Sequence, residues 1–323
     1  MKIAVDAMGG DLAPYEIIKG SVAAAQKDTL IVLVGNAKVV TPMLKEYSSN
    51  SYISLVDAPQ VIGYDDSPTK AVRRKKHSSI VAGIDLVKKG DVDAFVSAGH
   101  TGAVATAAIL NLGRAKGVPR PALAAILPSV AGPVLLLDIG ANSDCKPQFL
   151  AGFANLGHTY AANVLRIDSP RIGLLSNGEE ANKGTKLVRS VHKLLETSKL
   201  NFVGNVEGKD LMKGEVDVVI TDGFTGNAVL KTIEGFAEFI FATIRRSTET
   251  AGDEKPRDGA MDPAVQHAIA SMSKKLDWSE HGGAILLGIK GNVVVAHGRS
   301  RAKAITSAIR MAKLAVDRLP PTE

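Results

Sequence analysis

The chain is poor in aromatic residues and in cysteine. Aromatic side chains make up 4% of its 323 residues, and Cys145 is the single cysteine. One cysteine excludes an internal disulfide framework and fits a reducing compartment. No apolar run approaches the ~18 residues of a membrane span, and the first residues resemble a strand and turn rather than a signal peptide. We therefore expect a cytoplasmic protein, with a peripheral position at the inner face of the membrane as the alternative.

Several sequence signatures of common enzyme classes are also missing. Without G-x-G-x-x-G or G-x-x-x-x-G-K-[ST], a Rossmann dinucleotide site and a P-loop ATP site are disfavoured. Without G-x-S-x-G, a serine acyl-enzyme is not indicated. The seven histidines show neither H-x-x-x-H nor H-E-x-x-H spacing, which disfavours zinc. We expect no metal and no cofactor.

What the chain does have is a regular alternation of short apolar runs and amphipathic helical stretches. Hydrophobic residues make up 45% of the chain. Alternation of this kind predicts βαβ units and a mostly parallel sheet covered by helices on both faces, a three-layer α/β/α sandwich. We expect residues 1–323 to form a single domain. The expected strands are Ile3–Val5, Leu30–Val34, Ile53–Val56, Ala94–Val96, Leu123–Leu127, Val134–Leu137, Ile172–Leu175, Phe202–Val203, Val216–Ile220 and Val293–Ala296.

One region departs from this alternation. Phe236, Phe239, Ile240 and Ile244 form an apolar helical stripe, and a second stripe runs from Val265 to Leu276. The polar segment between them is rich in helix breakers. The pattern predicts a helical hairpin at residues 232–280 that projects from the sheet and contacts a second copy of the chain. A core pair within one subunit is the alternative.

Glycine-rich turns follow four of the expected strands. They lie in the segments IAVDAMGGD, AFVSAGHTGA, VLLLDIGAN and VVITDGFTGNAVLKTIEG, which start at Ile3, Ala94, Val134 and Val218. A strand, a turn and a helix start leave unpaired backbone N–H groups and a positive helix dipole, which suit an anion such as phosphate. Because ligands of parallel sheets bind beyond the carboxyl ends of the strands, we expect one site lined by backbone donors.

Charged and titratable side chains near these turns are further candidates. Lys183 follows another strand and could place an ammonium group on a phosphate or an oxyanion, or pair with Glu179 or Glu180 as a surface residue. His100 and His297 lie at strand ends, where each could carry a proton or be structural. The aspartates of the turns, Asp6, Asp11, Asp138 and Asp222, are more typical of turn-shaping acceptors than of a metal or base site.

The net charge of +6 favours an acidic partner, whether phosphate, a protein or anionic lipid. The only basic cluster is Arg73 to Lys76, which is either a solvated helix face or a docking patch. No aromatic platform accompanies it, so nucleic acid is not expected.

The motifs together resemble a known family. AVDAMGGD, DDSPTKAVRRKKHSS, AFVSAGHTGA, LLLDIGANSDCKP, GLLSNGEEANKGT, VITDGFTGNAVLKTIEG and GGAILLGIKGNVVVAHG follow one another as in the bacterial acyl-carrier-protein:phosphate acyltransferases, the PlsX family of phospholipid synthesis. The resemblance implies a fold related to phosphotransacetylases and to isocitrate and isopropylmalate dehydrogenases. It also implies a homodimer.

The reaction implied by the resemblance is attack of inorganic phosphate on the thioester of a long-chain acyl-carrier protein. The products would be acyl phosphate, which passes to a membrane glycerol-3-phosphate acyltransferase, and free carrier. Lys183, Asn227 and His297 are the expected catalytic residues. The expected contacts to phosphate and substrate are Asp6, Gly9, Gly10, Asp11, Ser97, Gly99, His100, Thr101, Gly102, Asn142, Asn177, Gly178, Asp222, Gly223, Phe224, Thr225 and Gly226.

Some positions differ from the family pattern, and two other functions remain open. His100, Ser176 and Thr185 stand where the family usually or often has asparagine, and the predicted hairpin tip is acidic rather than apolar or basic. The alternatives are a phosphotransacetylase-like enzyme that uses acyl-CoA and a carrier-binding scaffold without turnover. A decarboxylating dehydrogenase is disfavoured because no arginine cluster suits a di- or tricarboxylate.

Overall fold

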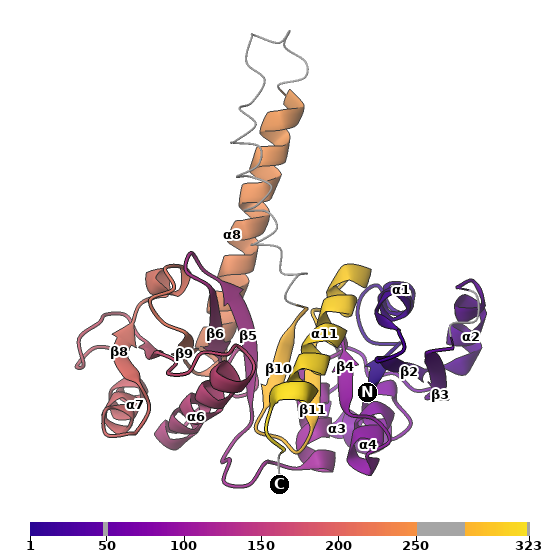
Figure 1. The fold of residues 1–323 in the computed structure, drawn as a ribbon, viewed down its shortest axis with the longest axis horizontal. Coiled ribbons are helices and arrows are strands. Elements are labelled where there is room, and N and C mark those ends of the chain that lie inside the picture. The colour runs from indigo at the N-terminus through magenta and orange to yellow at the C-terminus, as the bar shows by residue number, and fades with distance from the viewer. Residues whose placement is uncertain (48–50, 251–281, 322–323) are drawn as a thin grey trace.

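A single mixed sheet forms the centre of the molecule (Figure 1). The computed structural model describes residues 1–47, 51–250 and 282–321. In these residues eleven strands lie in the order β3-β2-β1-β4-β11-β10-β5-β6-β9-β7-β8. Their bounds are β1 Lys2–Asp6, β2 Leu30–Gly35, β3 Ile53–Asp57, β4 Ala94–Ser97, β5 Ala122–Pro128, β6 Pro133–Leu137, β7 Ile172–Leu175, β8 Phe202–Val206, β9 Val218–Ile220, β10 Ala284–Leu287 and β11 Asn292–Val295.

All ten expected strands are present, within a few residues of the expected bounds. Strand β10, a run of four apolar residues that forms a tight hairpin with β11, was not predicted. The turn between the two strands contains Gly288 and Gly291, both at positive φ, a conformation that glycine adopts without steric cost. A four-residue apolar run between glycines gave too weak a periodic signal to predict a strand.

Helices cover both faces of the sheet and produce two separate cores, which confirms the predicted α/β/α class. One core contains residues of α1, α2, α6, α7 and α11, and the other contains residues of α3, α4, α5 and α8. Side chains alternate between the cores along each strand: Ile3 and Val5 of β1 lie in the first and Ala4 in the second. The helices are α1 Tyr15–Ala24, α2 Ala37–Lys45, α3 Pro68–Arg74, α4 Ser79–Lys89, α5 Thr101–Ala107, α6 Pro147–Asn163, α7 Lys186–Glu196, α8 Gly223–Thr250 and α11 Ala302–Arg318.

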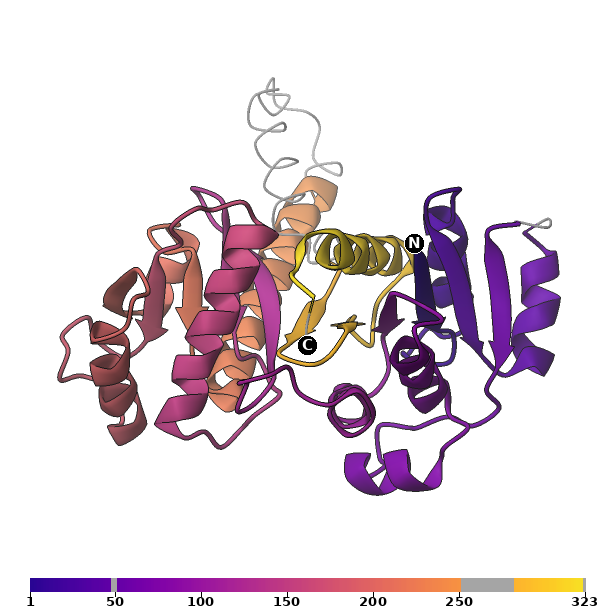
Figure 2. The same cartoon turned by 60° about the horizontal axis from the view of Figure 1, so that its bottom comes forward.

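The two halves of the sheet run in opposite directions. Three successive neighbouring pairs in the middle are antiparallel, β11 with β10, β10 with β5 and β5 with β6, whereas the pairs on either side are parallel. An odd number of reversals means that β6, β9 and β7 point opposite to β1, β4 and β11. The expectation that all glycine turns leave one edge of the sheet is therefore wrong. Figure 2 shows the two halves on either side of β10 and β11.

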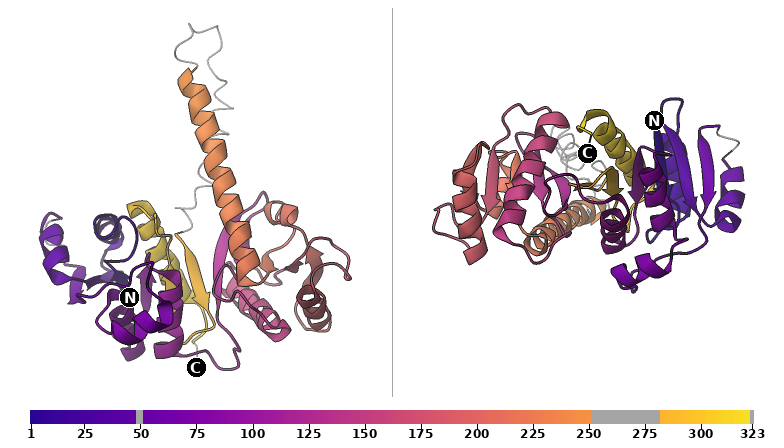
Figure 3. Two further views of the ribbon diagram at one scale, coloured as in Figure 1. Left: turned by 180° about the vertical axis from the view of Figure 1, so that it is seen from behind. Right: turned by 90° about the horizontal axis from the view of Figure 1, so that it is seen from below.

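Helix α8 connects the two halves and then leaves the body of the molecule. It begins at Gly223, and its 28 residues span about 42 Å. Seen from behind and from below, it starts beside β6 and passes the middle of the sheet before it projects outward (Figure 3). The first predicted stripe of the hairpin lies on α8, whereas most of the predicted loop and the second stripe lie outside the described residues.

Candidate functional site

A pocket of about 270 Å³ lies between α8 and the central strands β5, β10 and β11. The turns after β4, β6 and β11 reach it, so it draws on both halves of the sheet. Four predicted site residues line it: Thr101 and Gly102 from the start of α5, Asn227 from α8 and His297 after β11. Helix α8 passes from one half of the sheet to the other. Turns that leave opposite edges of the sheet therefore both reach the pocket beside this helix.

The positive charge of the pocket comes from Lys231. Its ammonium group lies 2.8 Å from Nε2 of His297 and 2.7 Å from Oε2 of Glu234. Glu234 also lies 3.9 Å from Nε2 of His297, so the three side chains form one compact group on the pocket wall. Lys231 and Glu234 were not among the predicted site residues. They follow Asn227 at intervals of four and three residues, and this spacing places all three on one face of a helix.

The surroundings of His297 favour a neutral ring. Its Nδ1 lies 3.1 Å from the backbone nitrogen of Arg299 and its Nε2 lies 2.8 Å from the Lys231 ammonium. Both neighbours are donors, so a neutral ring, which has one acceptor nitrogen, accepts from only one of them at a time. Burial and the neighbouring Lys231 lower the pKa of His297 below its ordinary value of 6.5. Near neutral pH the Lys231 ammonium and the neutral ring of His297 therefore meet at one point of the pocket wall. An anion there would accept from Lys231 in place of Nε2, and the ring, accepting from Arg299 at Nδ1, would donate to the anion from Nε2.

Asn227 adds a third donor at the end of the pocket nearest β6. Its Nδ2 donates to the carbonyl oxygen of Ile139 at 3.2 Å, which orients the amide and uses one of its two hydrogens. A methyl group on Gly140 would lie 3.1 Å from the same nitrogen, so the turn after β6 approaches Asn227 closely. The glycine allows this approach at φ +140°.

The first glycine turn packs behind the pocket. The buried carboxylate of Asp6 accepts from Ser97 Oγ at 2.7 Å and from the N–H of Met8 at 3.0 Å. Burial raises the pKa of Asp6, against the effect of these donors. Asp11 donates its N–H to the carbonyl oxygen of Gly298, next to His297. The predicted residues Asp6, Gly9, Gly10, Asp11, Ser97 and Gly99 are absent from the pocket lining and support the turns that carry Thr101 and His297.

Most backbone donors of the glycine turns are already used within the protein. The N–H groups of Gly223 and Gly226 donate to the carbonyl oxygens of Asn142 and Asp222. Those of Gly99 and Gly102 donate to Ser97 Oγ and to Nδ1 of His100. The expectation of a cradle of unpaired amides is therefore wrong for these positions. His100 caps α5, and the polar character of the pocket comes from side chains.

Two aspartates have the turn-shaping role. Asp138 is fully buried and accepts from the backbone N–H groups of Leu123, Gly140, Ala141 and Asn142 at 2.7–3.1 Å. The Asn142 side chain also donates to it, at 2.8 Å. Asp222 accepts from the N–H and the hydroxyl of Thr225, which fixes the start of α8. Both aspartates hold the turns that position Asn227.

The segment that contains Lys183 lies elsewhere. Lys183 is exposed and does not line the pocket at α8, whereas Asn177 and Gly184 border a second pocket of about 580 Å³. Asp222 and Thr225 also line this second pocket, on the side of α8 away from Lys231. Gly178 is buried beneath Lys183, and Phe224 is 72% exposed. The structure thus separates Lys183, Asn177 and Gly178 from Asn227 and His297.

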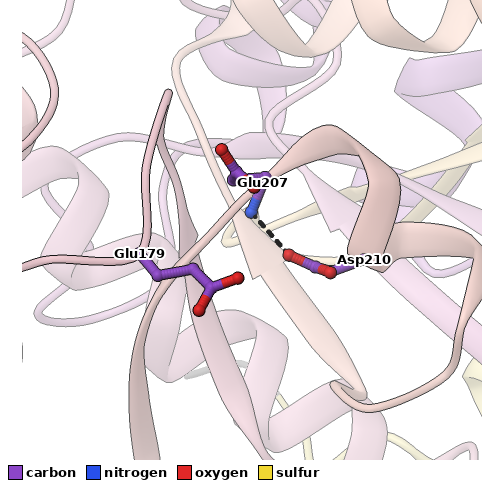
Figure 4. Close-up of side chains that lie close together, drawn as sticks. All are labelled: Glu179, Glu207 and Asp210. Atoms are coloured by element: carbon purple, nitrogen blue, oxygen red, sulfur yellow. Dashed lines mark hydrogen bonds between the residues drawn. The ribbon is translucent and has the colours of Figure 1, made fainter.

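Two other chemically capable groups lie outside the pocket. The ligand atoms of Glu179, Glu207 and Asp210 lie within 4.8 Å of one another (Figure 4). Lys209 pairs with both glutamates and Lys213 with Asp210, so each of the three carboxylates already has an ammonium partner. Burial raises the pKa of the Cys145 thiol to about 11, which keeps it protonated at neutral pH.

Comparison with known proteins identifies the family. A family model described as "Fatty acid synthesis protein" matches residues 1–322. The phosphate acyltransferase of Thermoanaerobacterium thermosaccharolyticum is 46% identical over 318 residues, which cover 98% of this chain and 93% of that protein. The enzyme of the same name from Desulforudis audaxviator is 48% identical over 317 residues, 98% of this chain and 92% of that one. The chain belongs to the phosphate acyltransferase family. It is therefore an acyltransferase.

Solved structures confirm the predicted relation of the fold to phosphotransacetylases. A branched-chain phosphotransacylase from Enterococcus faecalis superimposes with a TM-score of 0.62 at 14% identity, over 98% of this chain and 99% of that one. A 4-hydroxythreonine-4-phosphate dehydrogenase from Klebsiella pneumoniae gives a TM-score of 0.58 at 12% identity, over 98% and 99%. Within the described residues, no helix combines the length and the hydropathy needed to span a bilayer.

Proposed function

We propose that this acyltransferase converts a long-chain acyl-carrier protein and inorganic phosphate into acyl phosphate and free carrier. In the reaction a phosphate oxygen attacks the thioester carbonyl carbon, and the carbon–sulfur bond of the tetrahedral intermediate then breaks. The observation that carries the proposal is the contact of the Lys231 ammonium with His297 in a pocket whose remaining wall is largely apolar.

Each donor has a distinct task in this proposal. Lys231 and the Nε2–H of His297 hold the phosphate, and the remaining hydrogen of the Asn227 amide stabilises the oxyanion that forms on the thioester carbonyl. Phosphate is already a nucleophile and the thiolate is a stable leaving group, so the reaction requires no covalent enzyme intermediate. Glu234 accepts from Lys231 and limits its motion.

The acyl donor is proposed to be a carrier protein because a basic helix adjoins the pocket. A methyl group on Gly102, which lines the pocket, would lie 3.1 Å from Pro68, the first residue of α3. The same helix ends at Arg73 and Arg74, which are exposed, whereas Lys75 is paired with Asp66 at 2.6 Å. The free guanidinium groups suit an acidic protein, and carrier docking there would bring the thioester towards Thr101.

The proposed pathway, location and oligomeric state follow from the resemblance to the PlsX family. We propose that the product serves phospholipid synthesis and passes to a membrane glycerol-3-phosphate acyltransferase. The enzyme itself is proposed to be cytoplasmic, with peripheral contact at the membrane as the alternative, and homodimeric. Phe236 and Phe239 support the dimer: they lie on the projecting helix, 62% and 64% exposed, with ring centroids 6.4 Å apart.

The decisive experiment mixes the purified chain with palmitoyl-carrier protein and radiolabelled phosphate. We expect a labelled, hydroxylamine-sensitive acyl phosphate together with free carrier thiol. Carrier binding without this product would support the scaffold function instead.

A second arm of the experiment separates a carrier donor from acyl-CoA. Arg73→Glu/Arg74→Glu should lower kcat/KM with palmitoyl-carrier protein and change turnover with palmitoyl-CoA much less, because only the carrier is held by the basic helix. Preference of the unmodified enzyme for palmitoyl-CoA would favour the phosphotransacetylase-like alternative.

A further inference from the structure

We propose that the acyl chain of the substrate lies in an apolar trough between α8 and β5, and that Ala237 sets how long a chain can extend. The inference deepens the proposed function and rests on it for the identity of the ligand. Helix α8 presents two neighbouring stripes to the pocket. Asn227, Lys231 and Glu234 form the polar stripe, and Leu230, Ile233 and Ala237 form the apolar stripe.

The two stripes face different walls. At 100° per residue, the apolar stripe is rotated by roughly 90° from the polar one. The polar stripe faces the turn after β11, since Lys231 contacts His297 and Glu238 pairs with Arg299 at 3.3 Å. The apolar stripe therefore faces the other wall of the pocket, which β5 supplies.

The wall supplied by β5 is apolar along its whole length. Its lining residues run from Leu123 to Pro128. An alkyl chain between β5 and the apolar stripe of α8 contacts hydrocarbon on both sides. The binding free energy becomes more favourable by about 25 cal/mol for each Å² of apolar surface removed from water. The carbonyl end of that chain would lie at Asn227 and Lys231, so a linear acyl group fits the trough in one direction.

Ala237 occupies the outer end of the trough. It is the last residue of α8 that lines the pocket, and it lies six residues, or about 9 Å, along the helix from Lys231. Ile240 and Ile244 continue the apolar stripe at intervals of three and four residues along the projecting part of α8. A short acyl chain ends before Ala237, whereas a long one must pass its small side chain.

The test replaces Ala237 by phenylalanine and compares butanoyl- with palmitoyl-carrier protein as donors. We expect the ratio of kcat/KM for palmitoyl over butanoyl to fall on the order of tenfold or more, because the ring blocks only the longer chain. Ala242→Phe is the control: it adds the same bulk to the same helix at an exposed residue outside the pocket, and the ratio should stay that of the unmodified enzyme.

A fluorescent long-chain fatty acid provides a readout that does not depend on turnover. Its binding should weaken in Ala237→Phe and persist in Ala242→Phe. Equal loss of both donors in Ala237→Phe, or an unchanged ratio with unchanged probe binding, would overturn the trough. An unmodified enzyme that makes no acyl phosphate, yet binds the probe in a manner sensitive to Ala237, would overturn the proposed function and leave the trough standing.

Discussion

Two lysines are candidates for the phosphate ligand, and they lie in different parts of the molecule. Lys231 lines the pocket next to His297, whereas Lys183 lies in an exposed segment beside the second pocket. Lys231→Met should lower kcat/KM for acyl phosphate formation by roughly 100-fold or more, because the transition state loses its charged donor. Lys183→Met should have a much smaller effect. Steady-state rates with palmitoyl-carrier protein measure both.

The control for this pair is the thermal unfolding midpoint, which should change little because both side chains are partly or fully exposed. A loss in Lys183→Met as large as that in Lys231→Met would show that the segment from Ser176 to Thr185 reaches the substrate. It would also support the expectation from the sequence that Lys183 is a catalytic residue.

The pKa of His297 gives a second prediction with a defined sign. Lys231 lowers this pKa and Glu234 raises it, so Lys231→Met should move it up towards 6.5 and Glu234→Gln should move it further down. The pH dependence of the imidazole NMR signals measures both shifts. Because the folded protein binds this proton less readily than the unfolded chain, His297 has no effect on stability well above pH 6.5, where it is neutral in both states, and it destabilises the folded protein as the pH falls from 6.5 towards the lower pKa of the folded state. Shifts of the same sign in the two variants would contradict the arrangement.

The candidate site could be predicted in part, for reasons visible in single residues. His297 lies two residues after β11, and Asn227 lies near the start of the helix that follows β9. Segments after strand ends are where sequence patterns point to ligands. Lys231 lies one helical turn further on, where a lysine is more often solvated, and its importance depends on His297, a residue 66 positions away. Lys183 follows β7, which ends, like β9, at the opposite edge of the sheet from β11. Helix α8 carries Asn227 and Lys231 from that edge to the pocket, whereas Lys183 stays in the turn after β7.

At the level of elements, the start of α8 is held by close backbone contact. A methyl group on Gly226 would collide with the carbonyl oxygen of Asp138, whereas one on Gly235 of the same helix would meet no atom within 4 Å. Gly226→Ala should therefore destabilise the protein by about 1–3 kcal/mol and displace Asn227. Gly235→Ala should stabilise it by roughly 0.5–1 kcal/mol, since alanine favours the helix. Chemical denaturation of both variants measures the difference, and equal effects would contradict the packing.

The elements were easier to predict than their directions. Apolar runs predicted strands such as β1, β2 and β6, because each buries both faces between helices. The reversal of the second half of the sheet depends on β10, whose short sequence carries little pattern. It also depends on the antiparallel pairing of β5 with β6, and no local sequence signal distinguishes this pairing from a parallel pair joined by a crossover. Register and direction are therefore decided by contacts between residues far apart in the chain.

At the scale of the whole molecule, the projecting helix gives a prediction about assembly. Phe236→Glu/Phe239→Glu places two charges on the exposed ring pair of α8 and should convert the proposed dimer to monomers. Ala242→Glu adds charge to the same helix outside this pair and should leave the dimer intact. Light scattering after size-exclusion chromatography measures the mass of each. A dimer that survives the double substitution would place the subunit contact elsewhere.

The placement of β10 and β11 has a consequence for biosynthesis. These strands are made after residue 283, yet they join β4 and β5, which the ribosome completes more than 150 residues earlier. Until they are synthesised, the growing chain contains two separate parts of the sheet, and the strand edges that later pair with β10 and β11 are exposed. The part of the pocket wall that contains His297 is also missing. We expect the nascent enzyme to depend on chaperones late in translation, because long-range strand insertion is slow and leaves unpaired edges open to aggregation. We therefore expect catalytic activity only after β10, β11 and His297 have been synthesised.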